Sequence, residues 1–100
     1  MKINTKRLEN TVTAELIGRL DTPASLEVGN DLLILQNDAD KTIVLDCTAL
    51  EYISSSGLRI FLTLRKAANQ KGGKVVVKNI NDNIRSVFMM TGFLNLFEII

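Results

Sequence analysis

The longest run of hydroxyl side chains in this sequence is Ser54-Ser55-Ser56, which Gly57 follows directly. A serine hydroxyl can act as a nucleophile when a base removes its proton, cap the start of a helix, or accept a phosphate group. The residue types available elsewhere in the chain decide which of these three kinds of chemistry the segment can carry out.

The composition argues against catalysis by one of these serines. The chain has no histidine and a single cysteine, so it cannot form a Ser-His-Asp triad, a Cys-His pair or a zinc site built on histidines or thiolates. A nucleophilic Ser56 would need a carboxylate or lysine base, and Asp21 and Asp46 are the candidates. Unperturbed carboxylates are poor bases for a hydroxyl. We therefore expect no enzymatic activity, and stoichiometric acylation of Ser56 by an activated ester would contradict this expectation.

A helix start explains the serines in purely structural terms. Serine is among the commonest N-cap residues, and a glycine relieves crowding where a helix meets a sheet. The pattern predicts a helix from Gly57 to Gln70, which Gly72-Gly73 ends. One of the three serines would then accept a hydrogen bond from a free N–H group of the first turn.

Phosphorylation is the functional reading of the same position. Free N–H groups and the positive end of the helix dipole favour a phosphate, which adds about −1.5 to −2 charges. The fold would tolerate this dianion, whereas a neutral or acidic partner surface would not. The loss in affinity is on the order of a hundredfold or more. Such a switch needs no catalysis by this chain.

Alternating and continuous apolar runs predict the strands that position the serines. Apolar and polar residues alternate over 11–16, residues 2–8 form a weaker strand, and Glu9-Asn10 turns a hairpin between them. The run 42–45 predicts a central strand covered on both faces, and 74–78 predicts a second buried strand.

Helical spacing predicts two further helices. Thr22 is expected to cap the first, with Pro23 at its first helical position, and the apolar residues Leu26, Leu32, Leu33 and Leu35 extend it to about Asn37, with Gly29 as a local weakness. Asn81 is expected to cap the last helix, which carries Ile84, Val87, Phe88 and Thr91 and ends at Gly92. For Met89, Met90, Phe93 and Phe97 we expect core packing rather than a partner groove, with one methionine exposed.

A final strand over 96–100 completes the order β-β-α-β-α-β-α-β. Helices that alternate with strands indicate the α/β class. The predicted fold is therefore one domain over residues 1–100, with a mixed, mostly parallel sheet packed by about three helices.

The remaining composition narrows the function classes. Lys and Arg total 12 against 11 for Asp and Glu, and the one basic cluster, Arg65, Lys66 and Lys71, falls at a predicted helix end. We therefore expect no direct contact with nucleic acid. The chain lacks both common phosphate-binding glycine motifs, a signal peptide and any run of about 20 apolar residues. These features predict a cytoplasmic protein without membrane insertion, and Cys47 is expected in the core.

Three segments together resemble the STAS-domain family of bacterial anti-sigma factor antagonists over essentially the whole chain. Ser54-Ser55-Ser56-Gly57-Leu58 resembles the family's phosphorylation loop, Asp-Ser-Ser/Thr-Gly-Leu, after the strand 43–46. Gly18-Arg19-Leu20-Asp21 resembles its Gly-x-Leu-Asp strand end, and 83–100 resembles its C-terminal helix and strand. One position departs from the pattern, since Ser54 stands where the family has an aspartate.

The resemblance implies a partner-switching function. The hydroxyl residue before the glycine is the one phosphorylated in the family, so Ser56 is the implied phosphorylation site and Ser55 offers a second acceptor. The unphosphorylated protein would bind an anti-sigma factor that is also a serine kinase, and so release a sigma factor. ATP and Mg would belong to that kinase, this chain would need no cofactor, and a PP2C-type phosphatase would reverse the mark. The implied docking residues are Asp21, Thr22, Ser54, Ser55, Ser56, Gly57, Leu58 and Arg59.

A second reading keeps the STAS fold and drops the switch. Single STAS domains also serve as accessory subunits of larger assemblies, including bacterial lipid transporters, and the loop would then be a permanent docking surface. This reading predicts that Ser56→Asp leaves the affinity for the partner unchanged. The switch predicts that Ser56→Asp strongly weakens binding and that Ser56→Ala retains it.

Overall fold

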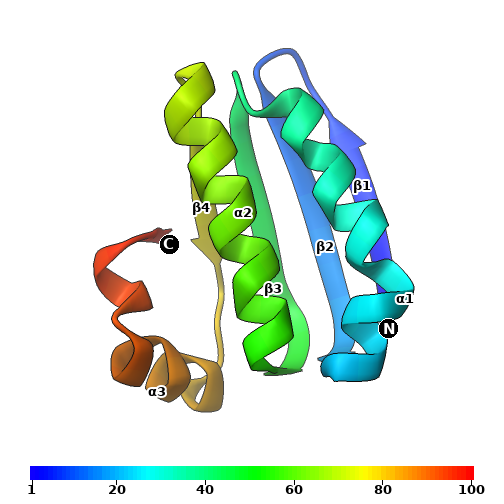
Figure 1. Cartoon of the computed structure of the whole chain (residues 1–100), viewed down its shortest axis with the longest axis vertical. Helices are drawn as coiled ribbons and strands as arrows, with labels where there is room; N and C mark the ends of the chain where they lie inside the picture. The colour runs from blue at the N-terminus through cyan, green and yellow to red at the C-terminus, as the bar shows by residue number, and fades with distance from the viewer.

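The five strands of the sheet lie side by side in the order of the sequence in the computed structural model, which describes residues 1–100 (Figure 1). The first pair is antiparallel and the other neighbours are parallel. The strands are β1 (Lys2–Arg7), β2 (Thr11–Leu20), β3 (Thr42–Ile53), β4 (Lys74–Lys78) and β5 (Glu98–Ile99). The predicted α/β class, the mixed sheet and the order of elements are confirmed.

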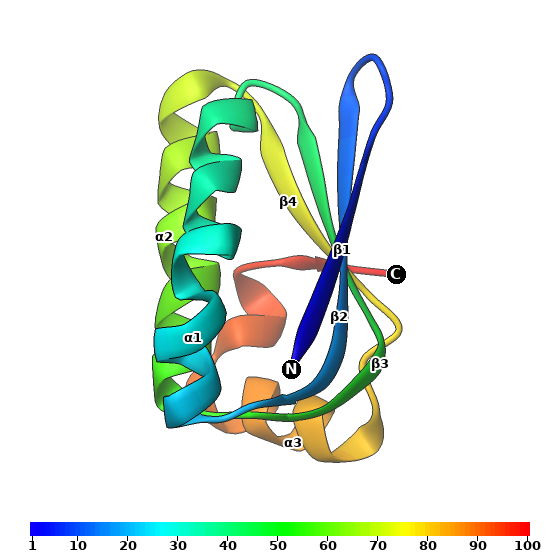
Figure 2. The same cartoon turned by 90° about the vertical axis from the view of Figure 1, so that its right-hand side faces the viewer.

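Two helices cover one face of this sheet. Figures 1 and 2 show α1 (Thr22–Leu33) and α2 (Ser55–Lys71) side by side on that face, while α3 (Asp82–Thr91) lies at the end of the sheet where β3 ends. Right-handed crossovers between parallel strands in sequential order place successive helices on the same face. The turns that lead into α1 and α2 therefore lie next to each other, at the carboxyl ends of β2 and β3.

The prediction that the strand at 42–45 is covered on both faces is wrong. Ile43 and Leu45 point into the core, but Val44 and Asp46 are only half-buried on the face without helices. The continuous apolar run is typical of a strand between two helix layers, and here both helices lie on one side. The prediction for β4 holds, because its three central valines are all buried.

β3 changes register against β2 at two places, and this shapes its carboxyl end. The shifts fall between Glu15 and Ile17 and between Gly18 and Arg19 of β2, where β3 carries extra residues. Because each bulge re-aims the side chains that follow it, the inward positions move from odd-numbered residues to Leu50 and then Ile53. The strand thus delivers the first serine beside the end of β2.

The caps and ends of the helices agree with the predictions in part. Asn81 caps α3, and Gly72 and Gly92 end α2 and α3 with positive φ, as expected. The first cap is different: Asp21, not Thr22, accepts the hydrogen bond from the N–H of Ala24 at 2.9 Å. A carboxylate that reaches the third N–H takes the cap position, which places Pro23 one residue further into the helix. After Leu33 the chain continues as a 3₁₀ segment, η1 (Ile34–Asp38), instead of an α-helix.

Four phenylalanines and the helix-facing strand residues form one core. Phe61 and Phe88 meet edge to face, with ring centroids 6.4 Å apart, and Phe93 and Phe97 join them through η2 (Phe93–Asn95). Leu26, expected on the apolar side of its helix, is 84% exposed, and both Met89 (65%) and Met90 (85%) are exposed where only one exposed methionine was expected. Val28 and Leu32 define the buried side of α1, and Ile84 and Phe88 that of α3, so the three exposed side chains fall off these stripes.

Candidate functional site

The first of the three serines caps α2. Ser54 is buried in extended backbone geometry, and its Oγ accepts a hydrogen bond from the Gly57 N–H at 3.2 Å. Its own N–H donates to the Leu20 carbonyl at 2.8 Å, which ties the loop to the end of β2. The predicted helix cap is therefore Ser54, and α2 begins at Ser55, two residues before the predicted start.

The other two serines lie in the first turn of α2. Ser55 is exposed and Ser56 is half-buried, and neither hydroxyl makes a hydrogen bond within the protein. The N–H groups of these first-turn residues have no acceptor inside the helix. Both hydroxyls are thus free to accept a chemical group, whereas the Ser54 hydroxyl is engaged.

The next two residues of the segment are buried. A Cβ on Gly57 would lie 2.8 Å from Leu20 Cγ and 2.9 Å from Ile53 Cγ1, distances that real side chains do not adopt. Leu58 packs into the core. The glycine therefore lets the helix start approach the ends of β2 and β3, and Gly57 and Leu58 support the surface from below.

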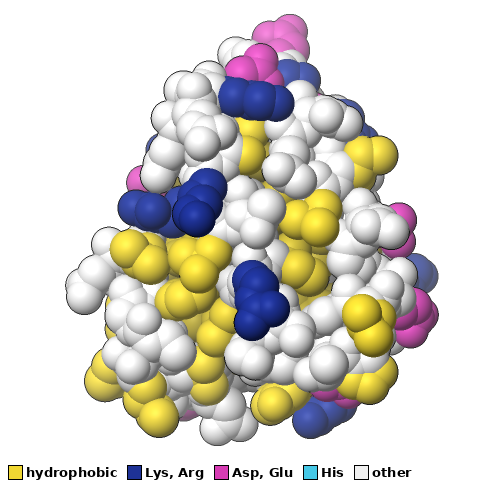
Figure 3. Space-filling model, viewed as in Figure 1, with side chains coloured by type: hydrophobic (Ala, Val, Ile, Leu, Met, Phe, Trp, Pro, Cys, Tyr) yellow, Lys and Arg dark blue, Asp and Glu magenta, His cyan; other side chains and the backbone are white.

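A groove between α1 and α2 gathers several of the predicted docking residues. It has a volume of about 430 Å³ and is lined by Thr22, Ser25, Leu26, Gly29, Asn30, Leu33, Ser56, Arg59 and Ile60. Figure 3 shows apolar side chains reaching the surface along the boundary between the two helices. Thr22, Ser56 and Arg59 therefore meet in one place, with Asp21 at the cap of α1 beside them.

Arg59 is the one charged side chain that lines this groove. It is exposed and belongs to none of the three ion pairs, which join Asp38 to Arg7 and Lys41 and Lys74 to Glu98. A single unpaired guanidinium one turn after Ser56 gives the groove a positive character suited to a carboxylate or a phosphate.

Neither candidate carboxylate is arranged as a base for Ser56. Asp46 lies on the face of the sheet that the helices leave open, where its carboxylate accepts hydrogen bonds from Thr48 Oγ1 at 2.6 Å and Thr48 N at 3.0 Å. Burial raises the pKa of Asp46, but these hydrogen bonds and the charge of Lys78 outweigh it, so the pKa lies below its usual value. Asp21 is engaged as the cap of α1.

Comparison with known proteins places this arrangement in a family. The STAS domain family model matches residues 2–100. The chain belongs to the STAS domain family.

Individual relatives of this STAS domain are bacterial proteins of similar length. It is 29% identical over 99 residues to a Bordetella bronchiseptica protein, BtrV, that is named as an anti-sigma factor antagonist, covering 99% of this chain and 85% of that one. The anti-sigma-B factor antagonist of Staphylococcus aureus is 24% identical over 99 residues, with 99% and 92% covered. The fold matches that of Bacillus SpoIIAA in its phosphorylated form, with a TM-score of 0.74 at 20% identity, covering 99% and 91% of the two chains.

The structure accounts for the one departure of this STAS domain from the family pattern. Ser54 replaces the aspartate at the head of the loop and makes the cap hydrogen bond to Gly57 N itself. Serine and aspartate are about equally good N-caps. In this chain a neutral side chain therefore caps the start of α2.

Six residues that line the groove were not among the predicted docking residues: Ser25, Leu26, Gly29, Asn30, Leu33 and Ile60. Gly29 and Leu26 come from the middle of α1 and line the groove opposite Ser56. The sequence held one signal for Leu26, because it lies off the apolar stripe formed by Val28, Leu32 and Leu35. An apolar residue away from the buried face of a helix points to solvent.

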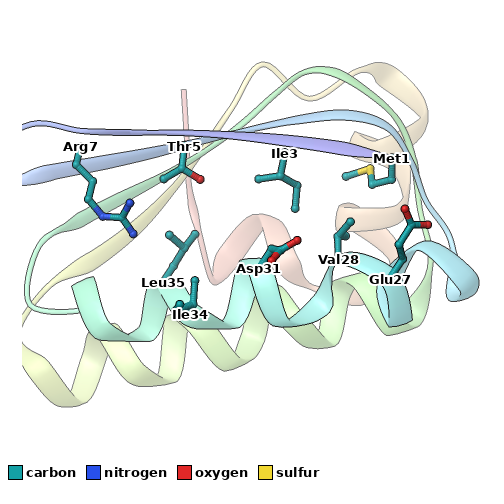
Figure 4. A pocket seen from close by; sticks show the side chains of 9 residues that line it. All are labelled: Met1, Ile3, Thr5, Arg7, Glu27, Val28, Asp31, Ile34 and Leu35. Atoms are coloured by element: carbon teal, nitrogen blue, oxygen red, sulfur yellow. The ribbon is translucent and has the colours of Figure 1, made fainter.

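The largest hollow on the surface of this STAS domain lies on another side of α1. It measures about 500 Å³ and lies between β1 and α1, with Ile3 and Arg7 on the strand facing Val28 and Asp31 on α1 and Leu35 on η1 (Figure 4). Neither Ser55 nor Ser56 lines this hollow, so the largest hollow and the groove that holds a free serine hydroxyl are different parts of the surface. The free hydroxyls and the unpaired arginine make the α1–α2 groove the candidate functional site.

The one thiol of this STAS domain lies in the core. Burial, together with the neighbouring Asp46 charge, raises the pKa of the Cys47 thiol to about 12, so this side chain is a neutral core residue, as predicted. No group of three His, Cys, Asp or Glu side chains is placed to hold a metal ion. None of the helices has both the length and the apolar character required to cross a bilayer.

Proposed function

We propose that this chain is an anti-sigma factor antagonist whose binding is switched off by phosphorylation of Ser56. The observation that carries the proposal is the free Ser56 hydroxyl in the first turn of α2, on a groove that also holds the unpaired Arg59. The STAS domain match over residues 2–100 and the antagonist names of relatives aligned over 99% of the chain support it.

The position of Ser56 suits a reversible phosphate. The free N–H groups of the first turn and the positive end of the dipole of α2 stabilise a dianion without disturbing the core. Arg59, three residues further along the same helix, is within reach of a phosphate on Ser56. Ser55, which is exposed, is a second acceptor in the same turn.

The partner supplies the chemistry of the switch. In the proposed cycle an anti-sigma factor that is also a serine kinase binds the unphosphorylated loop and releases its sigma factor. ATP and Mg bind to that kinase, and a PP2C-type phosphatase removes the phosphate. The docking surface on this chain consists of Asp21, Thr22, Ser55, Ser56 and Arg59, supported by Ser54, Gly57 and Leu58.

Binding measurements with loop variants test the proposal. Purified serine kinases of the anti-sigma factor class from the genome that encodes this chain serve as probes in isothermal titration calorimetry. We expect Ser56→Ala to bind like the wild type and Ser56→Asp to bind at least about a hundredfold more weakly. Incubation with ATP and Mg should add one phosphate, located to Ser56 by mass spectrometry.

Two controls sharpen the outcome. Ser55→Asp places the same charge one residue away, on the exposed side of the turn, and should weaken binding less than Ser56→Asp does. If Ser56→Asp binds as tightly as the wild type, the loop is a permanent docking surface and the switch is wrong. If none of these kinases binds, the proposed function itself is wrong.

A further inference from the structure

Gly29 has no structural reason to be a glycine. It lies in the middle of α1, where glycine is less favourable than alanine. Its backbone is not among the residues with positive φ, so no unusual conformation requires it. A Cβ at this position would meet only Ile60 Cδ1 at 3.7 Å, which is an ordinary van der Waals contact. The helix therefore carries a destabilising residue that neither geometry nor packing requires.

Gly29 forms part of the floor of the α1–α2 groove, where its backbone is buried and an added methyl group would point toward Ile60. Gly29 lines the groove together with Leu26 and Leu33 of the same helix and Ile60 of α2. Leu26 is also costly for the isolated domain, because 84% of this leucine is exposed to water. Leu26 thus forms an apolar wall beside a position that has no side chain. An apolar group from another molecule could occupy the space next to this wall.

The polar lining of the groove indicates which polar group of the partner would bind beside that apolar group. Arg59 is its one charged residue and has no partner within the chain. A guanidinium favours a carboxylate, with which it can form two parallel hydrogen bonds. The groove thus combines a small apolar surface, formed by Gly29, Leu26 and Ile60 and called the seat below, with the cationic side chain of Arg59.

We propose that the groove receives one apolar side chain of the partner, seated over Gly29 against Leu26 and Ile60, while a carboxylate of the same partner segment pairs with Arg59. This inference rests on the proposed function for the identity of the partner, an anti-sigma factor. It also specifies how the switch acts. A phosphate on Ser56 enters the same groove, competes with the carboxylate for Arg59 and brings charge next to the apolar seat.

Gly29→Ala separates a binding role from a folding role. The added methyl group should raise the melting temperature by about 2–6 °C, because alanine is the better helix residue. It should also weaken binding of the anti-sigma factor kinase about tenfold or more, because it fills the seat. Stabilisation and loss of affinity in the same variant distinguish a functional glycine from a structural one.

Leucine variants provide a matched pair. Leu26→Ala removes a wall of the groove and should weaken binding about tenfold with an unchanged melting temperature. Leu8 is likewise exposed, at 76%, but lies in the β1–β2 turn at the opposite end of the sheet. Leu8→Ala should change neither quantity. Arg59→Ala should weaken binding and reduce its dependence on salt.

The outcomes separate this inference from the proposed function. If the wild type binds and Gly29→Ala binds equally tightly, the groove is not the seat, although the antagonist function stands. A lower melting temperature for Gly29→Ala would show that the glycine serves the fold, and would likewise overturn the inference. If the wild type binds none of the anti-sigma factor kinases, the proposed function fails and the occupant assigned to the groove fails with it.

Discussion

Replacing Gly57 by alanine tests whether the start of α2 is set by close packing. The backbone of Gly57 has ordinary helical geometry, so the substitution introduces no dihedral strain. Its new methyl group, however, would lie 2.8 Å from Leu20 Cγ and 2.9 Å from both Leu20 Cδ2 and Ile53 Cγ1. Leu20 and Ile53 are buried at the ends of β2 and β3. Leu20 is 0% and Ile53 3% exposed, so both would have to shift within the packed core.

Two opposing effects determine how much Gly57→Ala changes the free energy of unfolding. Forcing a methyl group into a filled core costs about 1–3 kcal/mol, whereas alanine in place of glycine gains at most about 1 kcal/mol inside a helix. Position 57 lies in the first turn, where the helix propensity counts for less, so we expect a net loss of about 1–2 kcal/mol in the free energy of unfolding. Gly29→Ala meets no such contact and should gain about 0.5–1 kcal/mol.

Urea unfolding followed by far-ultraviolet circular dichroism measures both variants. Relative to the wild type, the midpoint should fall for Gly57→Ala and rise for Gly29→Ala, with equal slopes in each case. The two substitutions are chemically identical, so helix propensity alone cannot produce opposite signs. A midpoint for Gly57→Ala at or above that of the wild type would refute the packing argument.

Four further predictions follow from the same structure. Between pH 9.0 and about 12, only the thiol of the unfolded chain ionises. The unfolding free energy of the wild type should therefore fall faster with pH than that of Cys47→Ala, by up to about 1.4 kcal/mol per pH unit. Urea unfolding across this pH range measures the difference. Asp46→Asn should cost about 1 kcal/mol at pH 7. Folding lowers the pKa of Asp46, so this loss of stability should disappear as the pH falls below 3.8 and through the lower pKa of the folded state. Unfolding curves recorded at acid pH measure it. Gly73→Ala, whose Cβ would collide with the backbone oxygens of Ala39 and Lys41, should not fold at 37 °C by circular dichroism. Arg59→Ala and Ser56→Asp should weaken binding less than additively by calorimetry, because both act on the same contact.

Local signals in the sequence were sufficient for the elements and most of their ends. Gly72 and Gly92 follow helical patterns and adopt the positive φ that favours glycine, and Asn81 caps α3 because its side chain reaches the Ile84 N–H at 2.8 Å. The serine segment was correctly placed at a helix start for the same reason. Each of these features depends on a few consecutive residues.

Features that depend on distant parts of the chain were not predictable in the same way. The open face of β3 follows from both helices crossing on one side, which no single segment encodes. The cap of α1 depended on a choice between Asp21 and Thr22, two adjacent residues that are both suited to the role. The α1–α2 groove is formed by side chains about 30 residues apart, and only the packing of the two helices brings Gly29 and Leu26 opposite Ser56.

The sequential strand order has a consequence for how this chain folds. Each strand pairs with its predecessor in the sequence, so no pairing has to wait for a segment from the other end of the chain. Low sequence separation between partners favours rapid folding. During synthesis the β1–β2 hairpin can form first and offer an edge to β3, which in turn offers one to β4. The turns that carry the docking residues are completed before β4 and β5 are added.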